Sequence, residues 1–181
     1  MPFNKPSRDY PHEDRHTANI IRQRTARCVL KTATLSRLLV AAQFALIGLM
    51  LFAWLAELRL SGTAVAAMVA GIALGIWTLF FNRIGNFNIR PEPRPDGHLV
   101  TSGPYRVIRH PMYTAVLLLC AAPALSGFSW YQTTCWLLLL AVLWKKSSLE
   151  EDLLRQQYPN YATYATTAGR FLPRLPWPRR T

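Results

Sequence analysis

The sequence has few acidic residues, few cysteines and none of the motifs typical of soluble nucleotide-binding or zinc-binding proteins. It holds nine Asp and Glu against 21 Lys and Arg in 181 residues, a formal net charge of +12. Its three cysteines form no Cys-x-x-Cys pair, so neither a disulfide framework nor a metal site is expected. A Gly-x-Gly-x-x-Gly fingerprint is also missing. The apolar residues, which make up half of the composition, are therefore more informative about the class of protein.

The positive charge does not indicate a nucleic-acid-binding protein. The basic residues flank apolar runs instead of forming one stripe, and no nucleic-acid recognition motif is present. Membrane topology and attraction to anionic lipid headgroups account for such flanking charges. The expected partners are therefore membrane lipids and not nucleic acid.

Long uncharged runs occupy a large part of the sequence. Residues 38–55 and 62–81 are uncharged and long enough to cross the hydrocarbon core of a bilayer as helices. A third uncharged run, residues 112–144, is too long for one span, and Pro123 and Gly127 interrupt it. It is predicted to form two short helices, residues 112–125 and 130–144. The fold class is therefore an all-α membrane protein with about four transmembrane helices.

The distribution of basic residues predicts the orientation. Seven Lys or Arg lie in residues 1–33, five in residues 82–111 and seven in residues 145–181, whereas the first short connection holds only Arg59. Four spans place all three basic segments on the cytoplasmic side, as the positive-inside rule requires. Residues 1–33 are then a basic, solvated cytoplasmic tail without a signal peptide. Residues 34–181 are a single membrane domain.

A polar segment at the start of the third predicted span is the first candidate site. Gly103-Pro104-Tyr105 is typical of a turn, and Pro111 suits the first turn of a helix. His110 should therefore lie at a helix start, where free backbone N–H groups attract an anion, and Arg109 can bind a carboxylate in two-pronged fashion. An interfacial anchor would also explain Arg109, but it gives no reason for His110.

A second cluster follows the fourth predicted span. Lys146 and Glu150 are four residues apart on a continuing helix and could form a simple surface pair. If the last two spans form an antiparallel hairpin, Glu150 and Glu151 lie within a few ångströms of Arg109 and His110. Such convergence indicates a functional site, whereas a solvated acidic surface is the alternative.

A third segment, residues 158–173, is aromatic and short of charge. It is consistent with an amphipathic helix on the membrane surface or with a helical cover folded over the site. Composition leaves both possibilities open.

From about Gly75 to Pro173 the sequence resembles the isoprenylcysteine carboxyl methyltransferase-like family of integral-membrane enzymes, which has phospholipid methyltransferases among its more distant relatives. The resemblance rests on the following residues, in order: Asn86-Phe87-Asn88, His98 to Tyr105, Arg109-His110-Pro111-Met112-Tyr113, Glu150-Glu151, Tyr161, Tyr164 and Gly169 to Pro173. Their order and spacing together are specific, although each piece alone is weak.

The resemblance implies S-adenosylmethionine as cofactor and a lipophilic or lipidated methyl acceptor, with a carboxylate as the first expectation. The cofactor contacts implied are Gly97, His98, Leu99, Val100, Tyr105, His110, Tyr113 and Glu150. Arg109 and Glu150 are the implied catalytic residues. Lys146 stands where an Arg of the eukaryotic enzymes touches the substrate, so it is the implied substrate-binding residue. An acceptor that needs a base could use Glu150, Glu151 or His110.

Two other functions remain open at this stage. An NADPH-dependent membrane reductase of the sterol reductase type has a similar arrangement, but it is usually longer. A non-enzymatic membrane subunit or small transporter should carry polar residues at the middle of its spans, where Gln43 and Thr78 are nearly alone. The expected location is a multi-pass protein of the plasma or inner membrane in a prokaryote, or of the endoplasmic reticulum in a eukaryote, with its site facing the cytoplasm.

Overall fold

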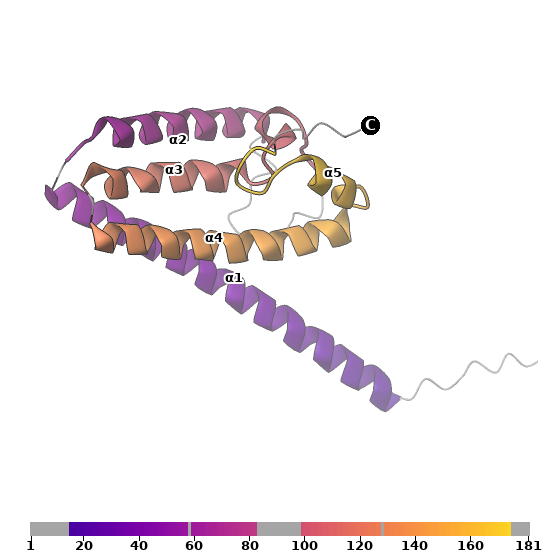
Figure 1. Cartoon of the computed structure of the whole chain (residues 1–181). Helices are drawn as coiled ribbons and strands as arrows, with labels where there is room; N and C mark the ends of the chain where they lie inside the picture. Colours follow the sequence, from indigo (N-terminus) through magenta and orange to yellow (C-terminus); the bar gives the residue numbers. More distant parts are fainter. Residues whose placement is uncertain (1–14, 58, 83–98, 128, 175–181) are drawn as a thin grey trace, which may run out of the picture. The chain divides into compact units, whose positions relative to one another are not determined.

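A computed structural model of the protein describes residues 15–57, 59–82, 99–127 and 129–174, with side chains from residue 33 onward apart from that of Glu57. The elements are α1 (Arg15–Glu57), α2 (Gly62–Phe81), the short 3-10 helix η1 (Gly103–Arg106), α3 (Pro111–Ser126), α4 (Trp130–Gln157) and α5 (Tyr161–Thr167) (Figure 1). The described residues contain no β-strand, only one isolated bridge between Ile108 and Gly169. The prediction of an all-α protein is therefore confirmed.

Helix α1 begins much earlier than predicted. The sequence predicts a helix from residue 38 after a solvated arm, but the helix begins at Arg15. Residues 15–37 contain neither Pro nor Gly, so nothing stops the helix from extending back from its apolar half. The chain divides into two units, Met1–Leu35 and Ser36–Thr181. The site and the contacts described below lie in the second unit.

Helices α2 and α3 pack closely and run in opposite directions. Ser61 caps α2, since its Oγ accepts from the backbone N–H of Ala64 at 3.1 Å, and it also donates to the carbonyl of Leu125 at the far end of α3, at 2.8 Å. Gly71 lies against the backbone of α3, where a Cβ would approach the carbonyl of Ala115 and the amide of Leu119 to about 3 Å. Small residues permit such close helix contacts in membranes.

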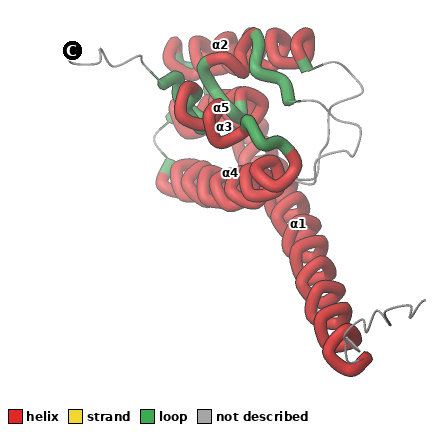
Figure 2. Tube along the Cα trace, turned by 90° about the vertical axis from the view of Figure 1, so that its right-hand side faces the viewer, coloured by secondary structure: helices red, strands yellow, loops and turns green. Residues whose placement is uncertain are grey.

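Helix α4 runs back along α3 and beside α1. The indole Nε1 of Trp136 donates to the carbonyl of Leu117 at 2.9 Å, and Gln132 Nε2 donates to the carbonyl of Met50 at 3.2 Å. Figures 1 and 2 show α2, α3 and α4 side by side, with α5 at the end where α4 finishes. The start of α3 and the end of α4 therefore meet at one end of the helices, which is the arrangement the predicted hairpin requires. Helix α3 continues through Pro123 to Ser126, so the break falls one turn later than that proline.

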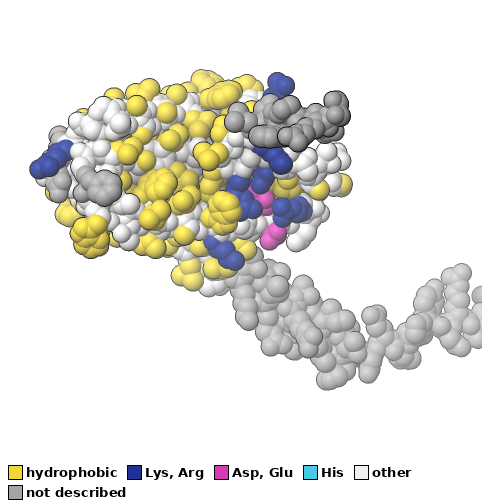
Figure 3. All heavy atoms as spheres, in the orientation of Figure 1, with side chains coloured by type: hydrophobic (Ala, Val, Ile, Leu, Met, Phe, Trp, Pro, Cys, Tyr) yellow, Lys and Arg dark blue, Asp and Glu magenta, His cyan; other side chains and the backbone are white. Residues whose placement is uncertain are grey.

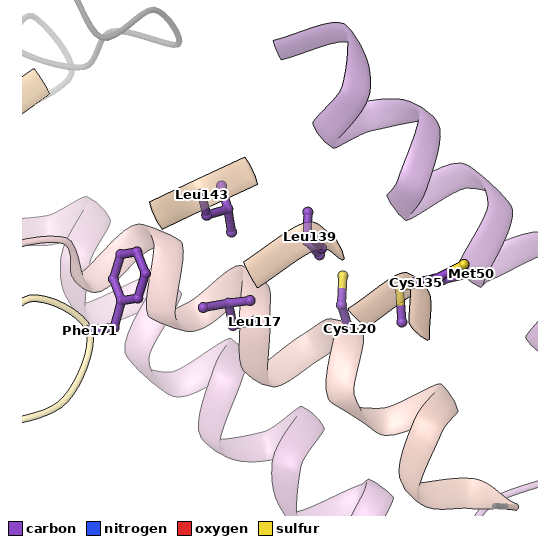
Figure 4. Packing of buried hydrophobic residues seen from close by; sticks show 7 residues of the cluster. All are labelled: Met50, Leu117, Cys120, Cys135, Leu139, Leu143 and Phe171. Carbon is purple, nitrogen blue, oxygen red and sulfur yellow. The ribbon is translucent and has the colours of Figure 1, made fainter. Parts of the chain in front are cut away.

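The core lies between α1, α3 and α4 and is completed by the chain after α5. Its buried residues are Met50, Leu117, Cys120, Cys135, Leu139, Leu143 and Phe171 (Figure 4). Phe171 lies at one end of this cluster and Met50 near the other. Phe171, which follows α5, is thus part of the core.

The outer surface of the helices is apolar. Residues Ala33–Ala56 and Gly62–Phe81 are each long and apolar enough to cross a membrane, and Pro111–Ser126 is a shorter apolar helix. Large apolar side chains such as Phe52 and Phe80 are 78% and 80% exposed. Figure 3 shows yellow apolar side chains over the helices and most of the blue and magenta charged ones gathered toward the α5 end. Exposed apolar area on this scale is typical of contact with lipid.

Candidate active site

The turn before α3 is fixed by Gly103. Its φ of 60° lies in the left-handed region, which favours glycine, and a Cβ there would overlap the ring of Phe81 at the end of α2. Pro111 occupies the first turn of α3 and His110 is its N-cap, as the sequence predicts. The glycine turn therefore brings Arg109 and His110 to the start of α3.

Glu151 of α4 lies at the centre of the site. Its side chain is fully buried, and Arg109 Nε donates to its Oε1 at 3.0 Å. The Nε2 atom of His110 lies 3.1 Å from the same oxygen. Arg170 and Arg155 approach the carboxylate from the C-terminal segment and from the next turn of α4. The predicted meeting of the two charged clusters is thus present in the structure.

The charges around Glu151 fix its ionisation. Burial would raise its pKa, but the hydrogen bond with His110 and the charge of Arg109 outweigh burial and lower the pKa to about 2. Burial would lower the pKa of His110, yet its hydrogen bonds to Glu150 and Glu151 raise it. Glu151 is therefore a carboxylate at neutral pH, and His110 favours the protonated form.

Glu150 has a different environment from its neighbour. Its Oε2 accepts a hydrogen bond from the hydroxyl of Tyr113 at 3.0 Å and lies 3.5 Å from His110 Nδ1. Its side chain is 30% exposed, and no described residue donates to its Oε1. Burial and then the charge of Glu150 raise the pKa of Tyr105. Glu150 can therefore accept a further hydrogen bond, whereas Glu151 is already surrounded by cations.

The C-terminal segment folds over the start of α3. The hydroxyl of Tyr164 on α5 donates to the carbonyl of Tyr105 at 2.6 Å, and Arg109 Nη1 donates to the carbonyls of Ala165 and Ala168. Of the two possibilities that the sequence leaves open, the structure therefore has the cover. The hydroxyl of Tyr161, in a residue only 1% exposed, has no hydrogen-bond partner within the described chain.

Lys146 is buried and does not pair with Glu150. Its Nζ donates to Gln43 Oε1 on α1 at 2.9 Å and lies 5.2 Å from the ring centroid of Tyr113. The residue is only 2% exposed. The surface pair that the i, i+4 spacing suggests is therefore not formed, because Lys146 faces α1.

The remaining predicted residues divide into two groups. Leu99 and Val100 are half-buried just before η1, while Gly97 and His98 lie outside the described residues. Sequence reasoning missed the central place of Glu151 and the roles of Arg170 and Gln43. A Glu-Glu pair on a helix offers no signal for which member faces inward.

A family model described as phospholipid methyltransferase matches residues 60–161, more than half of the chain. The chain belongs to the phospholipid methyltransferase family. A search of curated proteins gives no match. The family match extends from the residue before the Ser61 cap to the first residue of α5, so it includes the Arg109–His110 and Glu150–Glu151 clusters. The predicted membrane methyltransferase family is thereby confirmed.

Membership in this family means methyl transfer, and methyl transfer requires a methyl donor. The matched region ends before residues 162–174, so the contacts of Arg109 with the C-terminal cover fall outside it. Within the described part of the chain no group of three His, Cys, Asp or Glu is placed to hold a metal ion.

Proposed function

We propose that this member of the phospholipid methyltransferase family is an integral-membrane enzyme that moves a methyl group from S-adenosylmethionine to a lipophilic acceptor, with a carboxylate as the favoured acceptor group. The observation that carries the proposal is the convergence of His110 and Tyr113 with Glu150 at one end of an apolar helix bundle. A water-soluble cofactor and a lipid-borne acceptor both require a site at that boundary.

The side chains present are chemically suited to S-adenosylmethionine. Glu150 has an oxygen to which none of the described residues donates, and it suits an ammonium group, whereas the protonated form of His110 suits a carboxylate. The face of Tyr105 suits a cationic sulfonium centre. The unpartnered, buried hydroxyl of Tyr161 is a further polar group for which a bound molecule or a water would supply a partner.

We infer that Leu99, Val100, Tyr105, His110, Tyr113 and Glu150 hold the cofactor, together with Gly97 and His98. When bound, S-adenosylmethionine supplies a methyl group already activated on a positive sulfur. The protein then needs to hold the acceptor in line with that methyl group and to exclude water, and positioning alone is worth several kcal/mol. Arg109 contributes by fixing Glu151 and the cover, which it contacts through Nε and Nη1.

An acceptor carboxylate is ionised at neutral pH and needs no base. For an amine or a thiol, Glu150 is the proton acceptor we favour among Glu150, Glu151 and His110. Glu151 is surrounded by cations that hold its pKa near 2, and His110 favours its protonated form. Glu150 is half-exposed, and its Oε1 accepts no hydrogen bond from the part of the chain that the structure describes.

We infer that Lys146 orients the anionic group of the acceptor. Its ammonium is buried beside the apolar helices and is held by the neutral side chain of Gln43 and the face of Tyr113. Burial of a cation without a carboxylate partner is unfavourable, so an anionic group entering from the bilayer would stabilise it. A lipophilic anion fits both the charge and the surroundings.

The proposed topology has four spans, with both termini and the site on the cytoplasmic side. The alternating directions of α1 to α4 and the apolar surfaces of α1 and α2 support it. The location would be the plasma or inner membrane of a prokaryote, or the endoplasmic reticulum of a eukaryote. Reporter fusions at the C-terminus test this topology, and a C-terminus on the non-cytoplasmic face would contradict it.

The function is tested by transfer of a labelled methyl group. Purified protein in nanodiscs is incubated with S-adenosylmethionine labelled at its methyl carbon and with prenylcysteines, fatty acids, aminophospholipids or small thiols. We expect label in a lipid extract, most strongly with a carboxylate acceptor. Binding of NADPH in a thermal-shift assay, with no binding of S-adenosylhomocysteine, would contradict the proposal in favour of a reductase.

A further inference from the structure

A short segment after α5 crosses the entry to α3. We call Gly169–Arg174 the strap. Its backbone pairs with the chain just before α3: Gly169 N donates to the carbonyl of Val107 at 3.0 Å, and Arg109 N donates to the carbonyl of Gly169 at 2.7 Å. His110 N donates to the carbonyl of Arg170 at 3.1 Å. The strap therefore binds the backbone of Arg109 and of His110, two of the residues that contact Glu151.

Arg170 fastens the strap to α4. Its Nε lies 3.1 Å from Glu151 Oε1, and its Nη2 donates to Oε2 of the same carboxylate at 3.2 Å. Its Nη1 donates to Ser148 Oγ at 2.9 Å, and the guanidinium lies 4.5 Å from the ring centroid of Trp144. This two-pronged, stacked geometry is specific to arginine, because lysine lacks the planar fork.

The next residue of the strap adds an apolar contact. Phe171 is buried, and its ring meets those of His110 and Trp144 edge-on, with centroids 6.1 Å and 5.8 Å apart. Its carbonyl accepts from Thr114 Oγ1 at 2.7 Å. The ring of His110 is thus held by Phe171 on one side and by the stacked ring of Tyr113 at 5.4 Å.

We propose that Arg170 is a positioning residue of the site: by binding Glu151 it fastens the strap across the start of α3 and so fixes Arg109 and His110. The strap lies beyond the region matched by the family model, which ends at residue 161. The role of Arg170 in attaching the strap does not depend on which reaction the site catalyses. Its effect on methyl transfer rests on the function proposed above.

Two arginines serve as matched controls. Arg174 belongs to the same strap but its side chain is exposed. Arg155 also contacts Glu151, at 3.2 Å, but it lies on α4 four residues away and is 47% exposed, so it cannot fasten the strap. Changing Arg155 to Gln removes a charge near Glu151 and leaves the strap attached.

Amide hydrogen exchange in nanodiscs tests the fastening directly. In Arg170→Gln the amides of Arg109, His110 and Gly169 should exchange about tenfold faster or more, because the strap opens locally. In Arg174→Gln and in Arg155→Gln, the exchange rates of these three amides should stay within about twofold of the parent's rates. If Arg170→Gln fails to fold, Arg170→Lys is measured instead and should show the same acceleration to a smaller extent. Unchanged exchange at Arg109 and His110 in the folded Arg170 variant would overturn the proposal.

Methyl transfer then separates this inference from the proposed function. With an active parent, Arg170→Gln should lower kcat/KM by about 100-fold, and Arg170→Lys should recover part of it. The pH profile should move to higher pH, since loss of a cation favours the protonated forms of the neighbouring groups. The charged groups around this site are Arg109, His110, Glu150, Glu151 and Arg155, and Tyr161 is a further titratable group. Faster exchange with an inactive parent would contradict the proposed function and leave the strap assignment standing. Parent kinetics and an unshifted pH profile in Arg170→Gln would overturn the positioning role.

Discussion

The Nε2 atom of His110 lies 3.1 Å from Oε1 of Glu151, although 41 residues separate them in the chain. This contact joins the first residue before α3 to the buried face of α4. It also places His110 between two carboxylates, since its Nδ1 lies 3.5 Å from Glu150. Glu151 is thereby buried within the site, whereas Glu150 remains half-exposed.

Glu151→Gln should destabilise the folded protein strongly. The variant leaves Arg109, His110 and Arg170 without the charge that compensates them, and breaking one partner of a buried ion pair costs about 3–5 kcal/mol. The free energy of unfolding in detergent, measured by chemical denaturation, checks this. Asp152→Asn is the matched control, because that side chain is 65% exposed and should change stability by about 0.5 kcal/mol or less. Equal stability of the two variants would mean that Glu151 does not hold the site together.

Acid should remove the stabilising effect of Glu151 in a defined range. Its pKa is lowered from 4.5 to about 2 in the folded protein, so its contribution is fully present above pH 4.5 and is lost as the pH falls toward 2. The stability difference between the parent and Glu151→Gln should shrink by about 3 kcal/mol across this range. Unfolding free energies of both proteins at pH 5, 4, 3 and 2 give the difference. A difference that does not change with pH would show that Glu151 has an ordinary pKa.

Gly103→Ala should destabilise the turn before α3. The added methyl group meets both a left-handed φ of 60° and the ring of Phe81, and each such strain costs about 1–3 kcal/mol. Gly48→Ala is the control, since no atom lies within 4 Å of a Cβ there and Ala favours the helix. Thermal unfolding should show a lower Tm for Gly103→Ala and an unchanged or higher one for Gly48→Ala. The opposite order would contradict the packing of η1 against α2.

Lys146→Gln should impair catalysis with an anionic acceptor and leave cofactor binding unchanged. Without its ammonium the acceptor is less well oriented, and kcat/KM should fall about tenfold while the affinity for S-adenosylhomocysteine stays constant. Lys145→Gln is the control, because Lys145 is the preceding residue of α4 and is exposed. If the best acceptor proves water-soluble and Lys146→Gln transfers methyl at the parent rate, Lys146 only marks the cytoplasmic end of the fourth span.

The helical fold and the meeting of the two charged clusters could be predicted from local chemistry. Apolar runs give the helices, Pro111 gives the start of α3, and an antiparallel hairpin necessarily brings its ends together. These features depend on residues close in sequence or on chain direction alone.

The inward direction of Glu151 and the partner of Lys146 could not be predicted in this way. Both depend on how α4 is rotated about its axis, which is decided by packing against α1 and by the strap. Gln43 stands out in the sequence as a polar residue in an apolar run. Nothing in the sequence identifies its partner Lys146, which lies 103 residues away. The extension of α1 back to Arg15 depends on the lack of helix-breaking residues in a segment whose polar composition is equally typical of a solvated arm.

Isothermal titration calorimetry with S-adenosylhomocysteine tests the central claim, that Glu150 and His110 hold the cofactor. The parent protein in nanodiscs should bind, while Glu150→Gln and His110→Ala should each weaken binding at least about tenfold with the protein still folded, because each removes a charge-assisted hydrogen bond. Asp152→Asn, exposed on the same helix, should bind like the parent. Parent-like affinity in both Glu150→Gln and His110→Ala would contradict the assignment of this site.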